Sequence, residues 1–314
     1  MSINFIGNKN KYFVFSIFLI VLITVATIIN GVGLDIQFQG GYIFTYSYEG
    51  EVDKDKLETE IEKELNKQVN VQKTQDLGSG LNKIVVSFGA NKSLDSSLQK
   101  KLDNLFNSKF ADNKFKEIQI NNVDPTVGKE FFIKCMVAVL VAVLLMIVYI
   151  AFRFKKVGGW LAGSTAIVAL IHDVIMIYGT FVIFKMPIND FFIAGALLIL
   201  GYSVNDTIVI YDRIRENKKK YGSKMKFDEL VNLSINQSFM RTINTTVTTV
   251  LSIVVILVVA YLHGVNSIIS FMLPIMVGMI SGTYSTICIA GPLWVILKNK
   301  KKSKKVKKTL VEEN

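Results

Sequence analysis

Six long apolar runs divide this chain and decide most of what it can fold into. They cover Tyr12–Val32, Phe131–Phe152, Gly159–Phe184, Phe191–Tyr211, Ile243–Leu262 and Ile268–Leu297. A helix needs about 20 residues to cross the hydrocarbon core of a bilayer, and each run is long enough to do so. A hydrophobic fraction of 51% over 314 residues is also high for a soluble protein. We therefore expect a membrane bundle of six transmembrane helices.

The charges beside these runs predict how the chain lies in the membrane. Lys9 and Lys11 precede the first run, basic segments follow the second and fourth, and eight lysines crowd residues 298–308. The short loops 185–190 and 263–267 carry almost no charge. Because basic loops stay in the cytoplasm, both termini are predicted to be cytoplasmic and the first run to be an uncleaved span. The net charge of +11 then reflects attraction to anionic lipid and does not indicate nucleic acid.

This topology predicts four parts. Residues 1–33 form the cytoplasmic N-terminus and first helix, 34–130 an extracytoplasmic domain, 131–297 the other five helices with a cytoplasmic loop at 212–242, and 298–314 a basic cytoplasmic tail. Within the loop, the apolar residues of Phe227–Phe239 fall on one face of a helix. We expect this amphipathic helix to lie along the cytoplasmic interface.

The extracytoplasmic part has the patterns of a small α+β domain. Four strands are predicted, at Tyr42–Tyr48, Val69–Gln75, Lys83–Phe88 and Lys116–Val123, with Gly78 and Gly80 between the second and third. Two helices are predicted: one capped by Asp53 that buries Leu57, Ile61 and Leu65, and one that buries Leu94, Leu98, Leu102, Leu105 and Phe106. The order β-α-β-β-α-β predicts a ferredoxin-like fold.

The ends of this domain contain residues that suit a change of chain direction. Gly40 and Gly41 precede it, and Pro125 and Gly128 follow it. Such residues serve as hinges between moving parts, and ordinary turns use them equally often. They are therefore candidate hinges, with simple turns as the alternative.

The chain carries no pattern typical of an enzyme or of a cofactor or metal site. His172 and His263 are the only histidines, and neither has a cysteine or glutamate at helical spacing. Cys135 and Cys288 both fall inside apolar runs, which gives no disulfide framework. A phosphate-binding GxxxxGK[ST] motif is missing from the sequence. We expect no catalysis, no cofactor and no metal.

An acid inside the fourth apolar run is the most informative single residue. Asp206 lies in GYSVNDTIVIYDRIREN, residues Gly201–Asn217, beside Asn205 and four residues after Tyr202. A carboxylate at the centre of a transmembrane helix costs roughly 2.5–3.5 kcal/mol, so such acids are usually functional. The alternative is a hydrogen-bonded acid that only joins helices. His172 and Asp173 raise the same question in the third run.

The fifth run brings a cation toward the same depth. Arg241 is followed by Thr245, Thr248 and Ser252 on one side of a helix, and the fourth and fifth runs cross the membrane in opposite directions. An acid that is next to an arginine in one state and away from it in another could load and release a proton. The alternative is that Arg241 only anchors the helix at the cytoplasmic surface, and spacing alone leaves both open.

Five sequence blocks resemble a known family. They are GYSVNDTIVIYDRIREN (201–217), INQSFMRTINTTVTT (235–249), GLDIQFQGG (33–41), VDPTVGKE (123–130) and ALIHDV (169–174). In their order and spread they closely resemble the SecF branch of the SecD/SecF family, protein-export membrane proteins of the resistance-nodulation-division superfamily. The match in the fourth run is the most specific, and the blocks cover nearly the whole chain.

The resemblance implies a function and a set of partners. In that family six such helices pack pseudo-symmetrically with six from SecD in the bacterial cytoplasmic membrane, next to the SecYEG channel, with YajC as a further expected partner. The residues matching Asp206 and Arg241 are associated with proton passage, and the external domain is thought to draw the emerging preprotein outward. Asn205, Thr245 and Asp173 complete the candidate ion-coupling set, with either H⁺ or Na⁺ as the ion. The alternative is a half-transporter of the same superfamily that exports small molecules or lipids, although such exporters usually have both halves in one chain.

Overall fold

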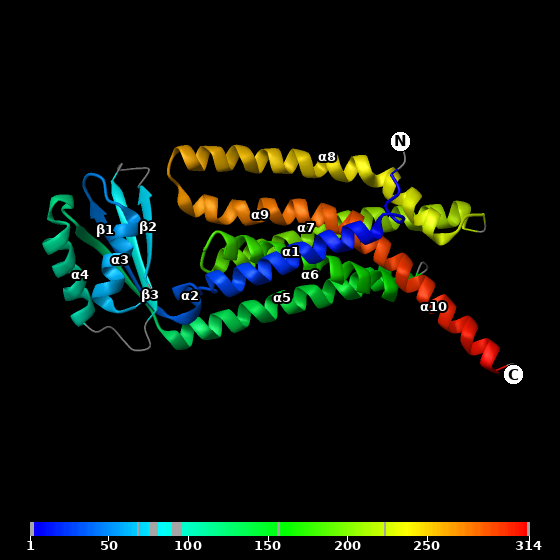
Figure 1. The fold of residues 1–314 in the computed structure, drawn as a ribbon, viewed down its shortest axis with the longest axis horizontal. Helices are drawn as coiled ribbons and strands as arrows, with labels where there is room; N and C mark the ends of the chain where they lie inside the picture. The colour runs from blue at the N-terminus through cyan, green and yellow to red at the C-terminus, as the bar shows by residue number, and fades with distance from the viewer. Residues whose placement is uncertain are drawn as a thin grey trace.

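The computed structural model has two parts, a small α/β domain and a long helical bundle (Figure 1). It describes residues 3–67, 69–75, 81–89, 96–155, 158–222 and 224–312. Six helical segments of the described chain are long and apolar enough to cross a membrane, as predicted. The α/β domain lies at one end of the bundle, and both chain termini lie toward the other end (Figure 1).

Five bundle helices are simple and the sixth is interrupted. α1 covers Lys9–Asn30, α5 Pro125–Arg153, α6 Gly159–Ile183, α7 Asp190–Tyr221 and α8 Phe227–Leu262. The last span begins as α9 (Asn266–Ser285), passes through a π-helical turn, η3 (Thr286–Ala290), and continues as α10 (Gly291–Glu312). Single π-helical turns inside α-helices are rare and often lie at functional sites.

The centre of the bundle is formed by α6 and α7. Of their apolar stretches, 61% and 56% of residues are buried, against 11% for α1 and α5 and 17% for α8. α9 packs against α6, α7 and α8. A Cβ added to Gly278 of α9 would lie 2.7 Å from Cγ1 of Ile199 and 2.9 Å from Cγ1 of Ile177, so glycine permits this approach. Side chains that meet inside the bundle therefore come mainly from α6, α7 and α9.

The structure contradicts the predicted interfacial helix between the fourth and fifth spans. Phe227–Phe239 is the first part of α8 and continues unbroken into the fifth span, so most of the predicted loop 212–242 is helical. Three apolar residues of this part of α8 belong to a buried core that also contains Trp294 of α10. They are Leu230, Val231 and Ile235. A Cβ at Gly291 would lie 2.8 Å from Cδ1 of Ile235, so glycine allows the contact. The apolar stripe thus packs on protein and not on lipid headgroups.

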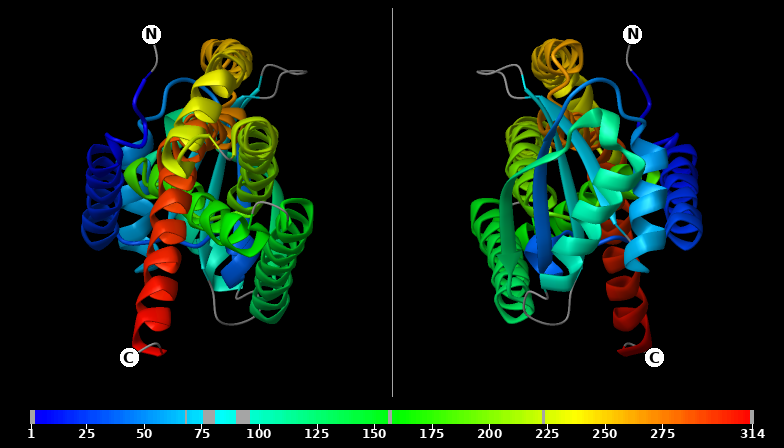
Figure 2. Two further views of the ribbon diagram at one scale, coloured as in Figure 1. Left: turned by 90° about the vertical axis from the view of Figure 1, so that its right-hand side faces the viewer. Right: turned by 90° about the vertical axis from the view of Figure 1, so that its left-hand side faces the viewer.

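The α/β domain has the predicted element order. Its elements are β1 (Gly41–Tyr48), α3 (Lys54–Leu65), β2 (Asn70–Gln75), β3 (Asn82–Gly89), α4 (Ser96–Lys109) and β4 (Lys116–Val123). The sheet order is β2-β3-β1-β4, and every neighbouring pair is antiparallel. This is the arrangement of the split βαβ fold, with one register shift between Thr45 and Tyr46. Figure 2 shows both helices on one face of the sheet.

Local sequence signals explain these elements. The Asp53 side chain caps α3 by accepting hydrogen bonds from the backbone N–H groups of Asp55 and Lys56. The predicted core residues of both helices that fall within the described residues are buried or half-buried: Leu57, Ile61, Leu65, Leu98, Leu102, Leu105 and Phe106. Leu94, Gly78 and Gly80 lie outside the described residues. The sequence patterns therefore suffice to predict the elements of this domain, because each pattern depends only on residues close together in the chain.

Candidate functional site

Asp206 occupies the middle of α7 and is enclosed by the bundle. The residue is 4% exposed, and its Oδ2 atom has no hydrogen-bond partner among the described residues. The adjacent Asn205 is exposed, because neighbouring helix residues point in different directions, so the structure does not bring these two candidates together. A buried carboxylate without a partner is costly in apolar surroundings. The ionised form of Asp206 therefore needs a hydrogen-bond donor or a positive charge close to its carboxyl group.

Arg241 of α8 forms no described ion pair with Asp206, although it lies near enough for its charge to act on that carboxyl group. Its residue is exposed, and the bundle arginines in described ion pairs are others, namely Arg153, Arg213 and Arg215. Thr245 is also exposed and donates to the carbonyl oxygen of Arg241 at 2.9 Å. Thr248 and Ser252 continue the exposed stripe. The predicted polar stripe on α8 exists, and its residues are exposed on the surface of this chain.

Polar contacts join α7 to α8 on both sides of Asp206. Toward the α/β domain, the hydroxyl of Tyr202 lies 3.1 Å from Oγ1 of Thr246. Toward the other end, Asn217 donates from Nδ2 to Oγ of Ser234 and to Oε1 of Gln237, each at 2.8 Å. These contacts fix the register of the two helices around Asp206.

Asp173 of α6 is completely buried and surrounded by serine hydroxyls. Ser203 of α7 and Ser285 of α9 donate to its Oδ2 at 2.7 and 2.8 Å. Ser281 of α9 donates to its Oδ1 at 2.7 Å. Short hydroxyl–carboxylate bonds are the stronger class of protein hydrogen bond. One carboxyl group therefore ties together three helices.

The neighbouring His172 extends this cluster. Its Nδ1 lies 3.4 Å from Oδ1 of Asp173 and 3.3 Å from Oγ of Ser281. Its ring centroid is 5.9 Å from that of Tyr284. The other ring nitrogen, Nε2, is buried without a hydrogen-bond partner among the described residues. The cluster thus contains two groups able to carry charge, an acid and an imidazole.

Sequence reasoning found Asp173 but missed its three serine partners. Serine is small and common in membrane helices, so a single serine is a weak signal. The available signal was spacing, because Ser281 and Ser285 are four residues apart and share one face of α9. Gly282 lies between them, and a Cβ there would be 3.2 Å from Cβ of Ser203. Close packing of α9 on α7 is what brings the serines to the acid.

The π-helical turn continues the polar contacts toward Asp206. Oγ1 of Thr286, the first residue of η3, lies 3.1 Å from Oγ1 of Thr207. Both oxygens also lie within reach of the carbonyl oxygen of Ser203, at 3.0 Å for Thr207 and 3.5 Å for Thr286, so one hydroxyl can donate to that carbonyl and the other to its neighbouring hydroxyl. Polar contacts therefore run from the Asp173 cluster to the residue after Asp206.

The four candidate hinge residues lie at one joint between domain and bundle. Gly40 has a φ of +79°, and a Cβ there would be 2.4 Å from Cα of Pro125. A Cβ at Gly128 of α5 would be 3.1 Å from the backbone of the short helix α2 (Ile36–Gln39). Gly41 has a φ of +148°, which residues with side chains rarely adopt. Close packing and backbone conformation account for these glycines.

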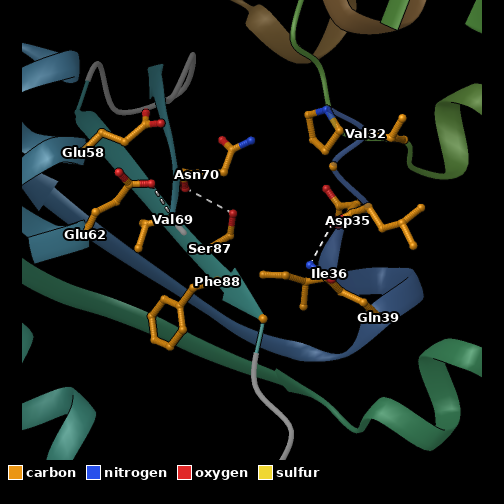
Figure 3. Close-up of a pocket in the computed structure, with 14 residues that line it drawn as sticks. Val32, Asp35, Ile36, Gln39, Glu58, Glu62, Val69, Asn70, Ser87 and Phe88 are labelled. Carbon is orange, nitrogen blue, oxygen red and sulfur yellow. Dashed lines mark hydrogen bonds between the residues drawn. The ribbon is translucent and has the colours of Figure 1, made fainter. Parts of the chain in front are cut away.

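A cleft separates the α/β domain from the bundle. One part, of about 320 Å³, lies between α3 with the β2–β3 strands and the segment 32–36 (Figure 3). Glu58 and Glu62 lie on one side of this part and Asp35 on the other (Figure 3). Two further parts, of about 420 and 370 Å³, extend along the α6–α7 loop. Asn70 and Pro187 line all three parts, so the cleft follows β2.

Contacts at the cleft hold the two sides in place. Asn266 at the start of α9 donates from Nδ2 to the carbonyl oxygen of Lys73 in β2 at 2.9 Å. The backbone N–H of Asp35 donates to the carbonyl oxygen of Ile188 at 2.9 Å. Burial raises the pKa of Asp35, and the charge of Asp190 raises it further, against the effect of hydrogen bonds from the α2 backbone. The joint therefore carries an acid that takes up a proton more readily than an acid in water.

Most of the chain matches one protein family. Residues 103–300 match the family described as "Protein export membrane protein SecD/SecF, C-terminal". The protein translocase subunit SecF of Sebaldella termitidis is 32% identical over 311 residues, which is 98% of this chain and 96% of that protein. SecF of Rickettsia typhi is 41% identical over 192 residues, which is 61% of this chain and 59% of that protein.

Solved structures give the same result. The crystal structure of SecDF, a translocon-associated membrane protein from Thermus thermophilus, matches 95% of this chain with 31% identity and a TM-score of 0.77. SecDF in its super-membrane-facing form matches 98% with 32% identity and a TM-score of 0.69. This chain spans 39–40% of those SecDF chains. It is a multi-pass bacterial membrane protein, and it belongs to the SecF branch of the SecD/SecF family of protein export membrane proteins.

Proposed function

We propose that this chain couples an ion gradient, with the proton as the expected ion, to motion of its α/β domain, and that this motion helps draw preproteins out of the Sec channel. The observation that supports this most directly is Asp206, a buried carboxyl group at mid-helix with an unpartnered oxygen. One charge that crosses a potential of 100 mV releases about 2.3 kcal/mol. That is comparable to the cost of breaking one or two hydrogen bonds such as that between Asn266 and Lys73.

A SecD subunit is the partner that this proposal requires. The stripe of Arg241, Thr245, Thr248 and Ser252 is exposed on a membrane helix. Its hydroxyls bond to their own backbone, but the Arg241 guanidinium has no described ion pair, and a charge that faces lipid is costly. The SecDF chains it resembles are more than twice as long as this chain, which leaves room for such a partner half. In the assembled pair Arg241 would approach Asp206 only in some states. SecYEG, YajC and the preprotein are the further proposed partners.

The orientation follows from the same scheme. Both termini lie at the end of the bundle opposite the α/β domain (Figure 1). The basic tail and the charged ends of α5 and α7 lie on the side of the termini, and basic segments favour the cytoplasm. We place the termini in the cytoplasm and the α/β domain outside, where a preprotein emerges.

Asp206→Asn provides the direct test. Vesicles that carry the variant with SecD and SecYEG should lose gradient-dependent stimulation of export, because the amide cannot gain or lose a proton, while assembly with SecD is unchanged. Asp112→Asn, an exposed acid of the α/β domain, is the matched control and should behave as the parent. Full gradient dependence in Asp206→Asn would refute the coupling role.

Two alternatives are separated by related measurements. Imposing a proton gradient and a sodium gradient separately identifies the ion. A half-transporter for small molecules or lipids would transport substrate without SecYEG, whereas the export role requires that channel. The relatives named above are protein translocase subunits, which favours the export role. No catalytic activity is proposed.

A further inference from the structure

Two buried polar atoms of neighbouring helices have no hydrogen-bond partner among the described residues. One is Oδ2 of Asp206 on α7, and the other is Oγ1 of Thr242 on α8. The residues are 4% and 1% exposed, so neither atom is free to bond with bulk solvent. Buried polar atoms almost always have hydrogen-bond partners, so two such atoms without partners on neighbouring helices require an explanation.

Thr242 differs from the other threonines of its helix. Four further threonines lie on α8, and each donates its hydroxyl to the carbonyl oxygen four residues earlier: Thr245, Thr246, Thr248 and Thr249. That local bond is the usual way for a threonine to satisfy its hydroxyl inside a membrane helix. Thr242 does not make it. Its hydroxyl therefore remains available to another helix.

The register of α7 and α8 places Thr242 opposite Asp206. Tyr202 and Thr246 are hydrogen-bonded across the two helices. Asp206 lies four residues after Tyr202, and Thr242 lies four residues before Thr246. The helices are antiparallel, so each step is one turn in the same direction on the same face. Register therefore places the two unpartnered atoms at the same level of the α7–α8 interface, one turn from an observed contact, without a direct hydrogen bond between them.

Other polar groups at the depth of Asp206 in the bundle already have hydrogen-bond partners. Asp173 has its three serine donors, and Thr207 pairs with Thr286 of η3. Arg241 is adjacent to Thr242 in sequence and its charge acts on Asp206, but the residue is exposed and forms no described ion pair with that acid. Thr242 is thus the group of the described bundle that matches Asp206 in position, burial and lack of partner.

We propose that Thr242 is the positioning residue for the Asp206 carboxyl group, bonded to it through one water molecule. This rests on the proposed role of Asp206 as the ion carrier. A hydroxyl both donates and accepts hydrogen bonds, so it serves the carboxylate as donor and the protonated acid as acceptor. Arginine only donates, and it would stabilise the charged form alone. Thr242 therefore satisfies both charge states of the carrier within one subunit.

The test uses the infrared C=O band of protonated Asp206 in membranes that contain the chain with SecD. Asp206→Asn identifies the band by its loss. Thr242→Val removes the hydroxyl at nearly constant volume, and the band should move to higher frequency because the acid loses a hydrogen bond. Thr242→Ser should restore the parent frequency. Thr24→Val on α1, where the hydroxyl donates to the carbonyl oxygen of Ile20 at 2.8 Å, is the matched control and should leave the band unchanged.

Export provides the second measurement. Thr242→Val should reduce gradient-dependent stimulation about tenfold, because the loss of one hydrogen bond to a charged group changes an equilibrium constant by about that factor. Thr242→Ser should retain the stimulation. An unchanged band and unchanged stimulation in a normally inserted Thr242→Val protein would overturn the inference. If Asp206→Asn also kept its gradient dependence, the proposed function would fail as well. Loss in Asp206→Asn with none in Thr242→Val rejects only the role of Thr242.

Discussion

Two carboxyl groups inside the bundle have opposite surroundings. Asp173 receives hydrogen bonds from three serines on two other helices, which replace the water that a charged group loses on burial. Asp206 has an oxygen with no such replacement among the described residues. A fully bonded acid is suited to a fixed structural state, and a partly bonded acid is suited to a change of state. The division of roles between the two can be measured.

Asp173→Asn should destabilise the bundle. The amide nitrogen cannot accept a hydrogen bond, so at least one serine hydroxyl loses its acceptor, at a cost of about 1–3 kcal/mol. Thermal unfolding of the purified protein in detergent measures the loss, with Asp112→Asn as the control. A melting temperature equal to the parent would contradict the importance of these bonds. An export rate below what the folded fraction explains would show that Asp173 also takes part in ion coupling.

The acids were visible in the sequence and their partners were not. Asp173 and Asp206 stand out because charged residues are rare in apolar runs. Ser203, Ser281 and Thr242 do not, because hydroxyl residues are tolerated anywhere in a membrane helix. Their roles depend on which faces of three helices meet, and that is a long-range property of packing. For Arg241 the sequence left pairing with Asp206 and anchoring at the membrane surface both open, and its exposed position in this chain does not decide between them.

The helix α9 packs on its neighbours through small residues. Gly278 approaches Ile199 of α7 and Ile177 of α6, while Gly282 approaches Ser203 beside the Asp173 cluster. Pro274 also lies within α9, where it removes one backbone hydrogen bond. Tight packing therefore takes the place of local helix propensity in keeping this element together.

Gly278→Ala should lower stability by about 1–3 kcal/mol, because the added methyl group would overlap two isoleucine side chains. Gly201→Ala on α7 is the matched control, since a Cβ there meets no atom within 4 Å. That control should be neutral or stabilised by up to about 1 kcal/mol, because alanine favours the helix. Thermal unfolding of both variants decides the matter. Equal melting temperatures would show that α9 can shift to make room.

Local sequence patterns predict which segments form helices and strands, but they do not predict what each element packs against. The strands and helices of the α/β domain follow from alternation, spacing and the Asp53 cap, all of which are local. For Phe227–Phe239, the same kind of pattern predicted an amphipathic helix correctly and its location wrongly. Apolar residues on one side of a helix indicate that this side is buried. They do not indicate whether lipid or Trp294 covers it.

In the complete molecule, the α/β domain meets the bundle in two ways. A tight joint forms where α2 packs on α5, with Gly40 against Pro125. A cleft lies along β2, where the hydrogen bond from Asn266 to Lys73 crosses between the two parts. Rotation about the joint would open or close the cleft with few bonds broken. The proposed motion of the domain makes a direct prediction here.

Cross-linking β2 to α9 should prevent the proposed rotation of the α/β domain relative to the bundle. Cysteines at positions 73 and 266, in a chain with Cys135 and Cys288 replaced by alanine, would be joined by a short cleavable reagent. Gradient-dependent export should fall to the level without a gradient and return on cleavage. Each single-cysteine chain treated in the same way is the control. Undiminished export in the cross-linked protein would mean that this cleft need not open.

The π-helical turn at Thr286–Ala290 has a consequence for the whole last span. A π-helical turn contains one residue more than regular α-helical winding, and one residue corresponds to about 100° of rotation. The sides that α9 and α10 present are therefore offset. Ser281 and Ser285 point at an acid in the membrane centre, while Trp294 enters an apolar core near the termini. The extra residue thus sets the rotation of the lysine-rich end relative to the serines, and deleting one residue from this turn would rotate that end by about 100° about the helix axis.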